Sequence, residues 1–435
     1  MLVSDYNYDL PEERIAKFPP KERGTTRLLV LDRETGALKD SHYRDLADFL
    51  NPGDVLILND TRVMQSRLFC ELPDGRKREL VVLEKHGNEP QRVMYRGKLH
   101  EGDCLVIRSR ESEIMLSRNV PSRPSLRGSV TPYFPRREIC SSKALSSDSP
   151  ELNNKTVTVT KILGNGIAEV ESNVPLAELA EKYGTVPLPP YLHRDATEAD
   201  KKRYQTVWAR NMGSAAAPTA SLNMTEELLD RLRAKGVIIK YLTLHVGLGT
   251  FLPIRSDKIE DHKMHSEWFN IPEDTIEAIS AIKQGRVLTE PIFPFAGLEF
   301  LSTSYAGAPA EPSLRDEPVG PGRNIRAKNS NHFMLTEKQV SVTRPRVVAL
   351  GTTVARTLEY YAKTGKTSGE DDIFIYPGFE FQIIDALITN FHAPKSTVLM
   401  LASAFAGWDN LKNAYEHAIN EKYNFLSYGD SMLIC

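Results

Sequence analysis

The pattern of apolar and polar positions divides the chain into two kinds of region. Between about residues 65 and 174, short runs rich in β-branched residues (ELVVLEK, CLVIR, TVTVTKI and IAEVE) alternate with turn-forming Gly, Asp, Asn and Pro. Helical spacing is lost in this stretch, so the pattern predicts a small all-β domain, built as a sheet or a barrel.

From residue 175 onward, the pattern predicts alternating helices and strands. TEELLDRLRAKG is typical of a helix capped by Thr225 and ended by Gly236, because acidic residues occupy its first turn and its leucines share one face. A buried strand, VIIKYLTLHV, follows it, and the same alternation recurs in RVVALG, TTVARTLEYYAKTG and IFIYPG. This order favours an α/β fold whose sheet is at least partly parallel.

These patterns predict two domains. The first 64 residues mix a hairpin, RLLVLDRETGALKD, with a short amphipathic helix and a strand, VLIL. We therefore expect a large α/β catalytic domain, residues 1–64 and 175–435, with an inserted small β-barrel domain, residues 65–174. Two stretches rich in Pro, Ser, Arg or Gly, at about 109–155 and 287–343, are predicted to be long surface insertions.

Composition excludes several classes of protein. The 435 residues are 41% hydrophobic and 26% charged, with a formal net charge of −2, so neither disorder nor an overall basic character is indicated. Cys70, Cys104, Cys140 and Cys435 lie far apart without a C-x-x-C pair, which argues against structural zinc and a disulfide framework. With no signal peptide or apolar span in the sequence, we expect no membrane partner and a reducing, cytoplasmic location.

Charge is unevenly distributed along the chain. Residues 62–137 contain 16 Lys and Arg against 9 Asp and Glu, although the chain as a whole is slightly acidic. A β domain of that sign fits a phosphate backbone, and the alternative is an ordinary solvated surface.

Two loops of small residues are candidates for contact with a ligand. GSAAAPTAS, residues 213–221, precedes a predicted helix, where small side chains and free amides suit an anion; close helix packing is the alternative. HVGLGTF, residues 245–251, follows a buried strand, and ligands sit at the carboxyl ends of strands in open α/β sheets. A tight loop without a ligand is the alternative there.

Two further motifs concentrate groups that exchange protons. DHKMHSE, residues 261–267, suits proton transfer or hydrogen bonding to a substrate, with a surface cluster as the alternative. A metal is disfavoured because H-x-x-H lacks helical i, i+4 spacing and a third ligand. TNFHAPKS, residues 389–396, places Asn390 and His392 at a predicted strand end, where a satisfied turn histidine is the alternative.

Taken in order, the motifs resemble a known family. The chain contains GDVLILNDTRV, VPLPPYLHR, AAPTA, TLHVGLGTF, HKMHSE, VVALGTTVARTLE, ITNFHAPKS and FLSYGD. Together they are similar to the S-adenosylmethionine:tRNA ribosyltransferase-isomerase family of queuosine biosynthesis, over most of residues 1–108, 156–286 and 344–435. The resemblance implies an α/β domain that carries a small β-barrel, in agreement with the domains expected above.

The resemblance also implies an activity. Members move the ribosyl moiety of S-adenosylmethionine onto 7-aminomethyl-7-deazaguanine in tRNA, which gives epoxyqueuosine and releases adenine and methionine. The implied partners are tRNA and S-adenosylmethionine, the latter as co-substrate, with no metal or other cofactor, and we expect a monomer. Such a reaction needs a base for the acidic proton beside the sulfonium, a donor for the leaving adenine and anchors for the methionine carboxylate.

Site residues follow from the matched motifs. His262, His265 and Glu267 match an H-x-M-H-x-E pattern and are the candidate catalytic acid and base groups. The candidate substrate-binding residues are Asn59, Asp60, Thr61, Arg62, Ala217, Pro218, Thr219, Asn223, His245, Gly247, Gly249, Thr250, Gly351, Thr352, Thr353, Arg356, Asn390 and His392.

One stretch departs from the family pattern. The family usually reads A-A-P-T-A-G-L-H-F, whereas Ser221, Asn223 and Met224 stand here in place of Gly, His and Phe. An asparagine can hydrogen-bond but cannot exchange protons near neutral pH. A catalytically impaired tRNA-binding relative is therefore the alternative function, while an ordinary methyltransferase is disfavoured because its glycine-rich strand-to-helix opening is missing.

Overall fold

The structure is a computed structural model that describes residues 1–83, 90–108, 155–164, 166–247, 249, 254, 256–286 and 344–435. Apart from residue 155, both predicted surface insertions lie outside the described residues. Thr250 and Cys140 lie outside them as well.

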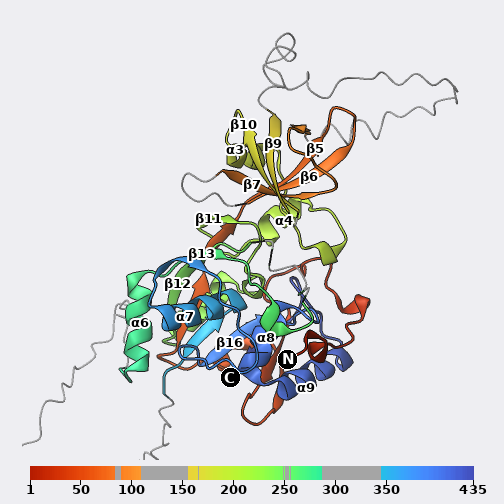
Figure 1. Ribbon diagram of the computed structural model, residues 1–435. Coiled ribbons are helices and arrows are strands. Elements are labelled where there is room, and N and C mark those ends of the chain that lie inside the picture. The colour runs from red at the N-terminus through yellow and green to blue at the C-terminus, as the bar shows by residue number, and fades with distance from the viewer. Residues whose placement is uncertain are drawn as a thin grey trace, which may run out of the picture. The chain divides into compact units, whose positions relative to one another are not determined.

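Nine strands of the described chain form one mixed sheet, in the order β15-β13-β12-β3-β14-β16-β17-β1-β2 (Figure 1). Four parallel strands make its centre: β12 (Ile238–Leu244), β3 (Val55–Asn59), β14 (Val347–Leu350) and β16 (Ala386–Asn390). The outer strands are β13 (Glu267–Asn270), β15 (Ser368–Asp371), β17 (Ser431–Ile434), β1 (Arg27–Leu31) and β2 (Leu38–His42). Because the central strands are parallel, their carboxyl ends all meet at one edge of the sheet.

Helices cover both faces of this sheet, which explains why its central strands are apolar throughout. Val55 and Ile57 of β3 belong to the core on one face, whereas Leu56 and Leu58 belong to the core on the other. The first core includes α6 (Glu273–Lys283), α7 (Thr352–Thr364), α8 (Thr397–Ala406) and α9 (Trp408–Asn420). The second includes α5 (Glu226–Ala234) and a 3-10 helix, Tyr43–Asp48, at the place of the predicted short helix.

Six antiparallel strands close into a separate barrel, in the order β10-β7-β6-β5-β8-β9. These strands are β5 (Arg67–Glu71), β6 (Lys77–Val82), β7 (Gln91–Arg96), β8 (Cys104–Ile107), β9 (Thr156–Gly164) and β10 (Ile167–Ser172). Alternate apolar residues of the barrel share a core with α3 (Leu176–Tyr183). The predicted fold class, an α/β sheet with a small closed barrel, is confirmed, while the exact domain boundaries stay a prediction.

Several short elements complete the described chain. They are the parallel pair β4 (Thr61–Val63) and β11 (Asn211–Ser214), the helix α4 (Glu198–Arg203), and 3-10 helices at Val3–Tyr6, Glu12–Arg14, Pro190–Leu192, Thr219–Ser221 and Ile259–Asp261. Within the described ranges, no helix is long and apolar enough to cross a membrane.

The strand predicted from IFIYPG is wrong. Residues 373–378 form no strand, and the parallel neighbour of β14 that follows in the chain is β16. Pro377 has no N–H to donate and Gly378 has a φ of 97°, so the segment turns, while Ile375 packs into the core. The predicted N-cap is confirmed, because the Thr225 side chain accepts a hydrogen bond from the Leu228 N–H at 3.1 Å.

Candidate functional site

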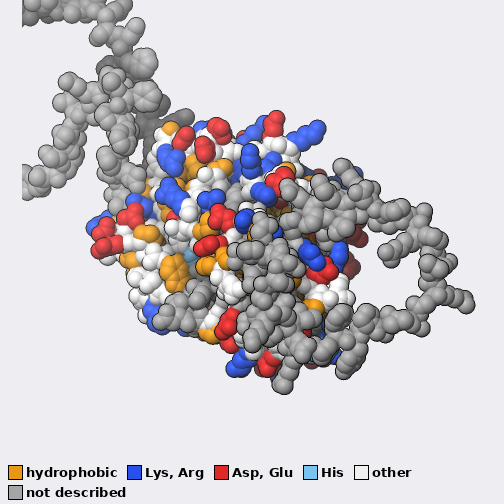
Figure 2. Space-filling view, turned by 90° about the horizontal axis from the view of Figure 1, so that it is seen from above, with side chains coloured by type: hydrophobic (Ala, Val, Ile, Leu, Met, Phe, Trp, Pro, Cys, Tyr) orange, Lys and Arg blue, Asp and Glu red, His pale blue; other side chains and the backbone are white. Residues whose placement is uncertain are grey.

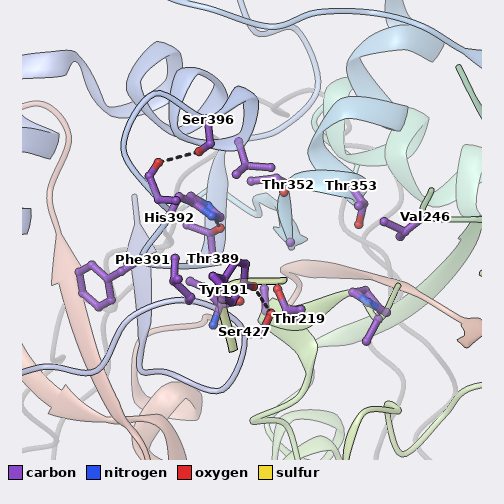
Figure 3. A pocket seen from close by; sticks show the side chains of 18 of the residues that line it. Tyr191, Thr219, Val246, Thr352, Thr353, Thr389, Phe391, His392, Ser396 and Ser427 are labelled. Atoms are coloured by element: carbon purple, nitrogen blue, oxygen red, sulfur yellow. Dashed lines mark hydrogen bonds between the residues drawn. The ribbon is translucent and has the colours of Figure 1, made fainter. Parts of the chain in front are cut away.

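A cavity of about 150 Å³ lies where the central parallel strands end (Figure 3). Val246 follows β12, Gly351 follows β14, and Asn390 ends β16. The other lining residues are Tyr191, Ala217, Pro218, Thr219, Ala220, Thr352, Thr353, Thr389, Phe391, His392, Ala393, Pro394, Ser396, Val398, Leu426 and Ser427. The structure thus joins six sequence motifs, with lining residues from Tyr191 to Ser427, at the sheet edge where open α/β folds bind ligands.

The first turn of α7 forms one wall of the cavity. Gly351 adopts a φ of 100° and a ψ of 152°, a conformation that non-glycine residues rarely reach, and so lets the chain pass directly from β14 into α7. No side chain caps this helix, and no acidic residue lies in its first turn. In Figure 3, Thr352 and Thr353 lie near Val246. The amides of such a first turn are suited to bind an anion.

Asn390 is a buried polar side chain that also lines the cavity. It is 2% exposed, and its Nδ2 donates to the carbonyl oxygen of Asp430 at 3.4 Å. No donor among the described residues reaches its Oδ1. Asn390 therefore offers an acceptor at the cavity lining.

His392 is held by hydrogen bonds on three sides. Its Nε2 lies 2.8 Å from the Thr389 hydroxyl, its N–H donates to the Tyr415 hydroxyl, and its carbonyl accepts from the Tyr8 hydroxyl. Burial lowers the pKa of His392 to about 3, so the ring is neutral near pH 7. It lines the cavity as an uncharged group.

Sequence reasoning missed several lining residues, among them Tyr191 and Ser427. The Tyr191 hydroxyl lies 2.5 Å from the Ser427 hydroxyl, and burial raises the pKa of Tyr191 to about 12. Both residues stand inside motifs that carried the family resemblance, VPLPPYLHR and FLSYGD. They are 236 positions apart, and nothing in either motif indicates that the two hydroxyls meet.

His265 and Glu267 form a pair beside this cavity. Nε2 of His265 lies 3.2 Å from Oε1 of Glu267, and the same oxygen accepts a hydrogen bond from the Gly247 N–H at 2.6 Å. The Gly249 backbone packs on the imidazole so closely that a β-carbon there would lie 2.6 Å from the ring. Since Val246 lines the cavity and Gly247 binds Glu267, two consecutive residues connect the cavity to the pair.

Arg356, on α7, binds Glu267 of this pair. Its Nη1 donates to Oε2 of Glu267 at 2.9 Å, its Nη2 donates to the carbonyl of Asp371, and its Nε lies 3.3 Å from Oδ2 of Asp371. Arg356 is 5% exposed and does not line the cavity, so the structure places it against Glu267 and not in reach of a ligand there.

Burial and the positive charge of Arg356 act in opposite directions on the pKa values of Glu267 and Asp371. Burial by itself raises the pKa of Glu267, but the positive charge of Arg356 and the contacts with His265 and Gly247 outweigh it, so the pKa lies below its usual value. For Asp371, burial dominates over the attraction of Arg356 and raises the pKa. Glu267 is therefore anionic near neutral pH.

The third candidate acid or base, His262, lies apart from that pair. Its ring packs edge-on against Phe374, with 5.1 Å between the ring centroids. Burial, with a smaller contribution from the charge of His265, lowers the pKa of His262. A lowered pKa makes His262 less suited to take up a proton near pH 7.

The N-D-T-R motif has mainly internal contacts. Asn59 is fully buried, and its amide oxygen accepts from the Leu244 N–H at 3.1 Å while its nitrogen donates to the Leu244 carbonyl at 2.9 Å. The Asp60 carboxylate accepts hydrogen bonds from the side chains of Asn211 and Thr243. Arg62 alone of the four is exposed.

Thr61 is bonded to His245. The Thr61 hydroxyl lies 2.8 Å from Nδ1 of His245, whose ring stacks on Trp268 with centroids 5.2 Å apart. A β-carbon at Gly213 would lie 2.7 Å from the same ring. His245 is thereby fixed between β12 and the small-residue loop.

Asn223 does not line the cavity. It is 2% exposed, and its Nδ2 donates to the Gly429 carbonyl at 2.9 Å and to the Ser431 hydroxyl at 3.2 Å. These bonds fasten the segment before β17 to the loop that precedes α5, which is a structural role.

The described residues contain no group of three or more His, Cys, Asp or Glu that is arranged to hold a metal ion. Cys70 and Cys435 are free thiols.

Comparison with known proteins establishes the family. The family model described as "Queuosine biosynthesis protein" matches residues 3–289 and 332–434. Relatives named S-adenosylmethionine:tRNA ribosyltransferase-isomerase from Pelodictyon phaeoclathratiforme and Chlorobium phaeobacteroides are each 42% identical, over 443 and 441 residues, with 100% of both chains covered. A crystal structure of S-adenosylmethionine tRNA ribosyltransferase from Thermotoga maritima aligns with a TM-score of 0.44 and 24% identity, over 99% of this chain and 100% of that one. The chain therefore belongs to the queuosine biosynthesis protein family.

Proposed function

We propose that this protein is an S-adenosylmethionine:tRNA ribosyltransferase-isomerase. It transfers the ribosyl moiety of S-adenosylmethionine to 7-aminomethyl-7-deazaguanine in tRNA and releases adenine and methionine, with epoxyqueuosine as the product. The observation that carries this proposal is the 42% identity to enzymes of that name over the whole chain. The meeting of the AAPTA, GTT and NFHAP motifs in one cavity supports it.

The geometry favours His265 as the base that removes the proton beside the sulfonium. A carboxylate only accepts hydrogen bonds, so the contact with Glu267 places the ring proton on Nε2 and leaves Nδ1 as the acceptor of the neutral ring. When Nδ1 takes up a proton, the adjacent negative charge of Glu267 stabilises the imidazolium. In this assignment Glu267 and Arg356 are positioning residues, and the remaining candidates near the cavity bind substrate.

The other parts of the proposal follow from the same assignment. S-adenosylmethionine acts as co-substrate without a resident metal or other cofactor, and the second substrate is tRNA. The proposed location is the cytoplasm, which agrees with the free thiols of Cys70 and Cys435. The proposed oligomeric state is a monomer.

No observation favours a catalytically impaired relative. That alternative rests on Asn223, whose hydrogen bonds go to Gly429 and Ser431 and which does not line the cavity. The proton-exchanging groups at His265 and Glu267 are in place.

A turnover assay tests the function. Purified protein is incubated with labelled S-adenosylmethionine and tRNA that bears the deazaguanine precursor, and free adenine, methionine and S-adenosylhomocysteine are quantified. We expect adenine and methionine in equal amounts. S-adenosylhomocysteine would indicate methyl transfer instead, and tRNA binding without turnover would indicate the impaired relative.

Three variants assign the base in the same assay. His265→Ala is expected to lower the rate by ~10²-fold or more, the usual contribution of a positioned acid or base, whereas Asn223→His changes it by less than about tenfold. His417→Ala is the matched control, because this histidine is bonded to Asp40 outside the cavity. If Asn223→His turned an inactive protein into an active one, the assignment of His265 would be wrong.

A further inference from the structure

We propose that the cavity binds the amino-acid end of S-adenosylmethionine, and afterwards the product methionine, with the carboxylate at the first turn of α7 and the ammonium at Asn390. This inference rests on the proposed function and adds the orientation of the co-substrate. It places the rest of the co-substrate outside the cavity, on the side where Val246 leads to the His265 and Glu267 pair.

The size of the cavity indicates that only part of the co-substrate enters it. Its volume is about 150 Å³. Pockets that enclose whole drug-sized ligands span roughly 300–1,000 Å³. A molecule with an amino acid, a ribose and an adenine therefore has to place one of its ends here.

The end of α7 provides donors for a carboxylate. α7 is 13 residues long, and its N-cap is Gly351, which has no side chain to accept from the first amides. The neighbouring helix α8 differs, because the Ser396 side chain accepts from the Leu399 N–H at 3.2 Å. Thr353 also lines the cavity, and its buried hydroxyl has no hydrogen-bond partner in the described part of the chain.

Asn390 gives a second, independent indication that the cavity binds a ligand. The Asp430 carbonyl can only accept a hydrogen bond, so the nitrogen of the Asn390 amide faces Asp430, and the buried amide oxygen of this lining residue has no donor among the described residues. A buried acceptor that has no donor is costly, and an ammonium group would satisfy it. An amide that accepts at one wall and a helix end that donates at another match the two charges of an α-amino acid.

The remaining walls agree with this ligand. Val398, Leu426 and Phe391 are apolar and suit the methylene groups beside the sulfur. His392 is uncharged because of its burial, so it does not repel the ammonium. Adenine, the other end of the co-substrate, has no negative group for the end of α7.

Binding of small probes tests the inference without any turnover. Affinities of the full chain are measured by calorimetry for L-methionine, for its analogue without the amine (methylthiobutanoate), for its analogue without the carboxylate (methylthiopropylamine) and for adenine. We expect methionine to bind about ten- to a hundredfold more tightly than either analogue, the usual worth of a hydrogen bond to a charged group. Equal affinities for methionine and its analogues, or tighter binding of adenine, would overturn the proposal.

Variants assign the two ends. Asn390→Ala should weaken methionine about ten- to a hundredfold and leave the analogue without the amine unchanged, whereas Thr353→Val should weaken methionine and spare the analogue without the carboxylate. Asn410→Ala is the control, because Asn410 likewise donates to a backbone carbonyl, that of Arg33, but does not line the cavity. Equal weakening of all probes by Asn390→Ala would mean that the residue only supports the fold.

The binding measurements and the turnover assay can fail independently of each other. If adenine is released but methionine binds no better than its analogues, the orientation is wrong and the function stands. If methionine binds with the expected selectivity but no adenine is released, the function is wrong and the amino-acid site stands. Should Asn390→Ala not fold, the four probes on the unchanged chain still decide the orientation.

Discussion

Arg356 and Glu267 form a buried ion pair next to His265, the proposed base, and each charge compensates the other. The Arg356 side chain is 7% exposed and that of Glu267 2%, with 2.9 Å between Nη1 and Oε2. Removing one member of such a pair leaves a buried charge uncompensated, at a cost of about 3–5 kcal/mol. The sequence motifs identify His265, Glu267 and Arg356 as candidates, but they assign Arg356 to substrate binding, because the pattern does not show that Glu267 is within its reach.

The first prediction concerns the pH dependence of Arg356→Gln. The pKa of Glu267 is lowered in the folded chain, so its contribution to stability is present above its ordinary value of 4.5 and is lost as the pH falls through the lowered value. Without Arg356, burial is left as the largest effect and raises that pKa. We expect the acid limb of the rate profile to move to higher pH, measured by adenine release, together with a loss of unfolding free energy in urea.

A second buried pair provides the control for this prediction. Arg346 bonds the fully buried Asp54 at 2.7 Å and lies outside the cavity lining. Arg346→Gln should therefore lower stability by a similar amount without moving the acid limb. An equal displacement in both variants would show that the profile reports unfolding and not the protonation of Glu267.

At the scale of elements, the local sequence predicts a helix or strand well where a capping residue or a glycine fixes one of its ends. Thr225 and Gly236 bound the region of α5 correctly because a cap and a left-handed turn act within a few residues. IFIYPG has the composition of a strand, but its apolar side chains are buried by the core without a strand pairing. Composition reports burial, whereas a strand also needs a neighbour, which the local sequence does not contain.

The second prediction uses the two glycines that flank α7. Gly351→Ala is expected to destabilise the protein by about 1–3 kcal/mol, because its φ of 100° and ψ of 152° are strained for alanine. A β-carbon there would meet no atom closer than 3.6 Å, so the effect comes from the backbone. Since the first turn of α7 must shift to relieve the strain, the KM for S-adenosylmethionine should rise as well.

A variant of Gly365, at the other end of α7, distinguishes the effect on stability from the effect on substrate binding. The φ of 71° at Gly365 is also left-handed, a β-carbon there would lie in open space, and the residue does not line the cavity. Gly365→Ala should cost about 1–2 kcal/mol in thermal or urea unfolding and leave the KM unchanged. A rise of KM in both variants would mean that general loosening, and not the geometry of the first turn, controls binding.

At the scale of the whole molecule, the cavity shows where sequence reasoning ends. It draws residues from Tyr191 to Ser427, and the parallel strand order brings them together. The glycine-rich motif predicts a loop after a strand and the small-residue motif a loop before a helix, and the two motifs follow β12 and precede α5. Which loops face each other depends on the order β12-β3-β14-β16, a property of the assembled sheet that no single motif contains.

The same limit applies to the proposed tRNA surface, and the last prediction concerns it. The excess of Lys and Arg at residues 62–137 is partly neutralised in the fold, because Arg67, Arg76 and Arg108 pair with Glu79, Asp74 and Glu71. On the face seen in Figure 2, basic and acidic side chains are interspersed. Candidates for phosphate contact are therefore the exposed cations of this segment for which no carboxylate partner is found among the described residues, Arg62, Arg96 and Lys98.

We expect the triple variant Arg62→Gln, Arg96→Gln and Lys98→Gln to weaken tRNA binding and to flatten its salt dependence. Each lost phosphate contact should reduce the slope of log K against log salt concentration by about 0.7–0.9, because fewer counterions are released. The control replaces Lys363, Lys366 and Lys412, exposed cations of α7, its C-terminal turn and α9, by Gln, which changes net charge equally. Filter binding between low and moderate salt gives both slopes. A slope that falls equally in the two variants reports net charge alone, because net charge acts over the whole surface. A change confined to the first variant places the RNA backbone along β4 and the end of β7, because a phosphate contact acts at one residue.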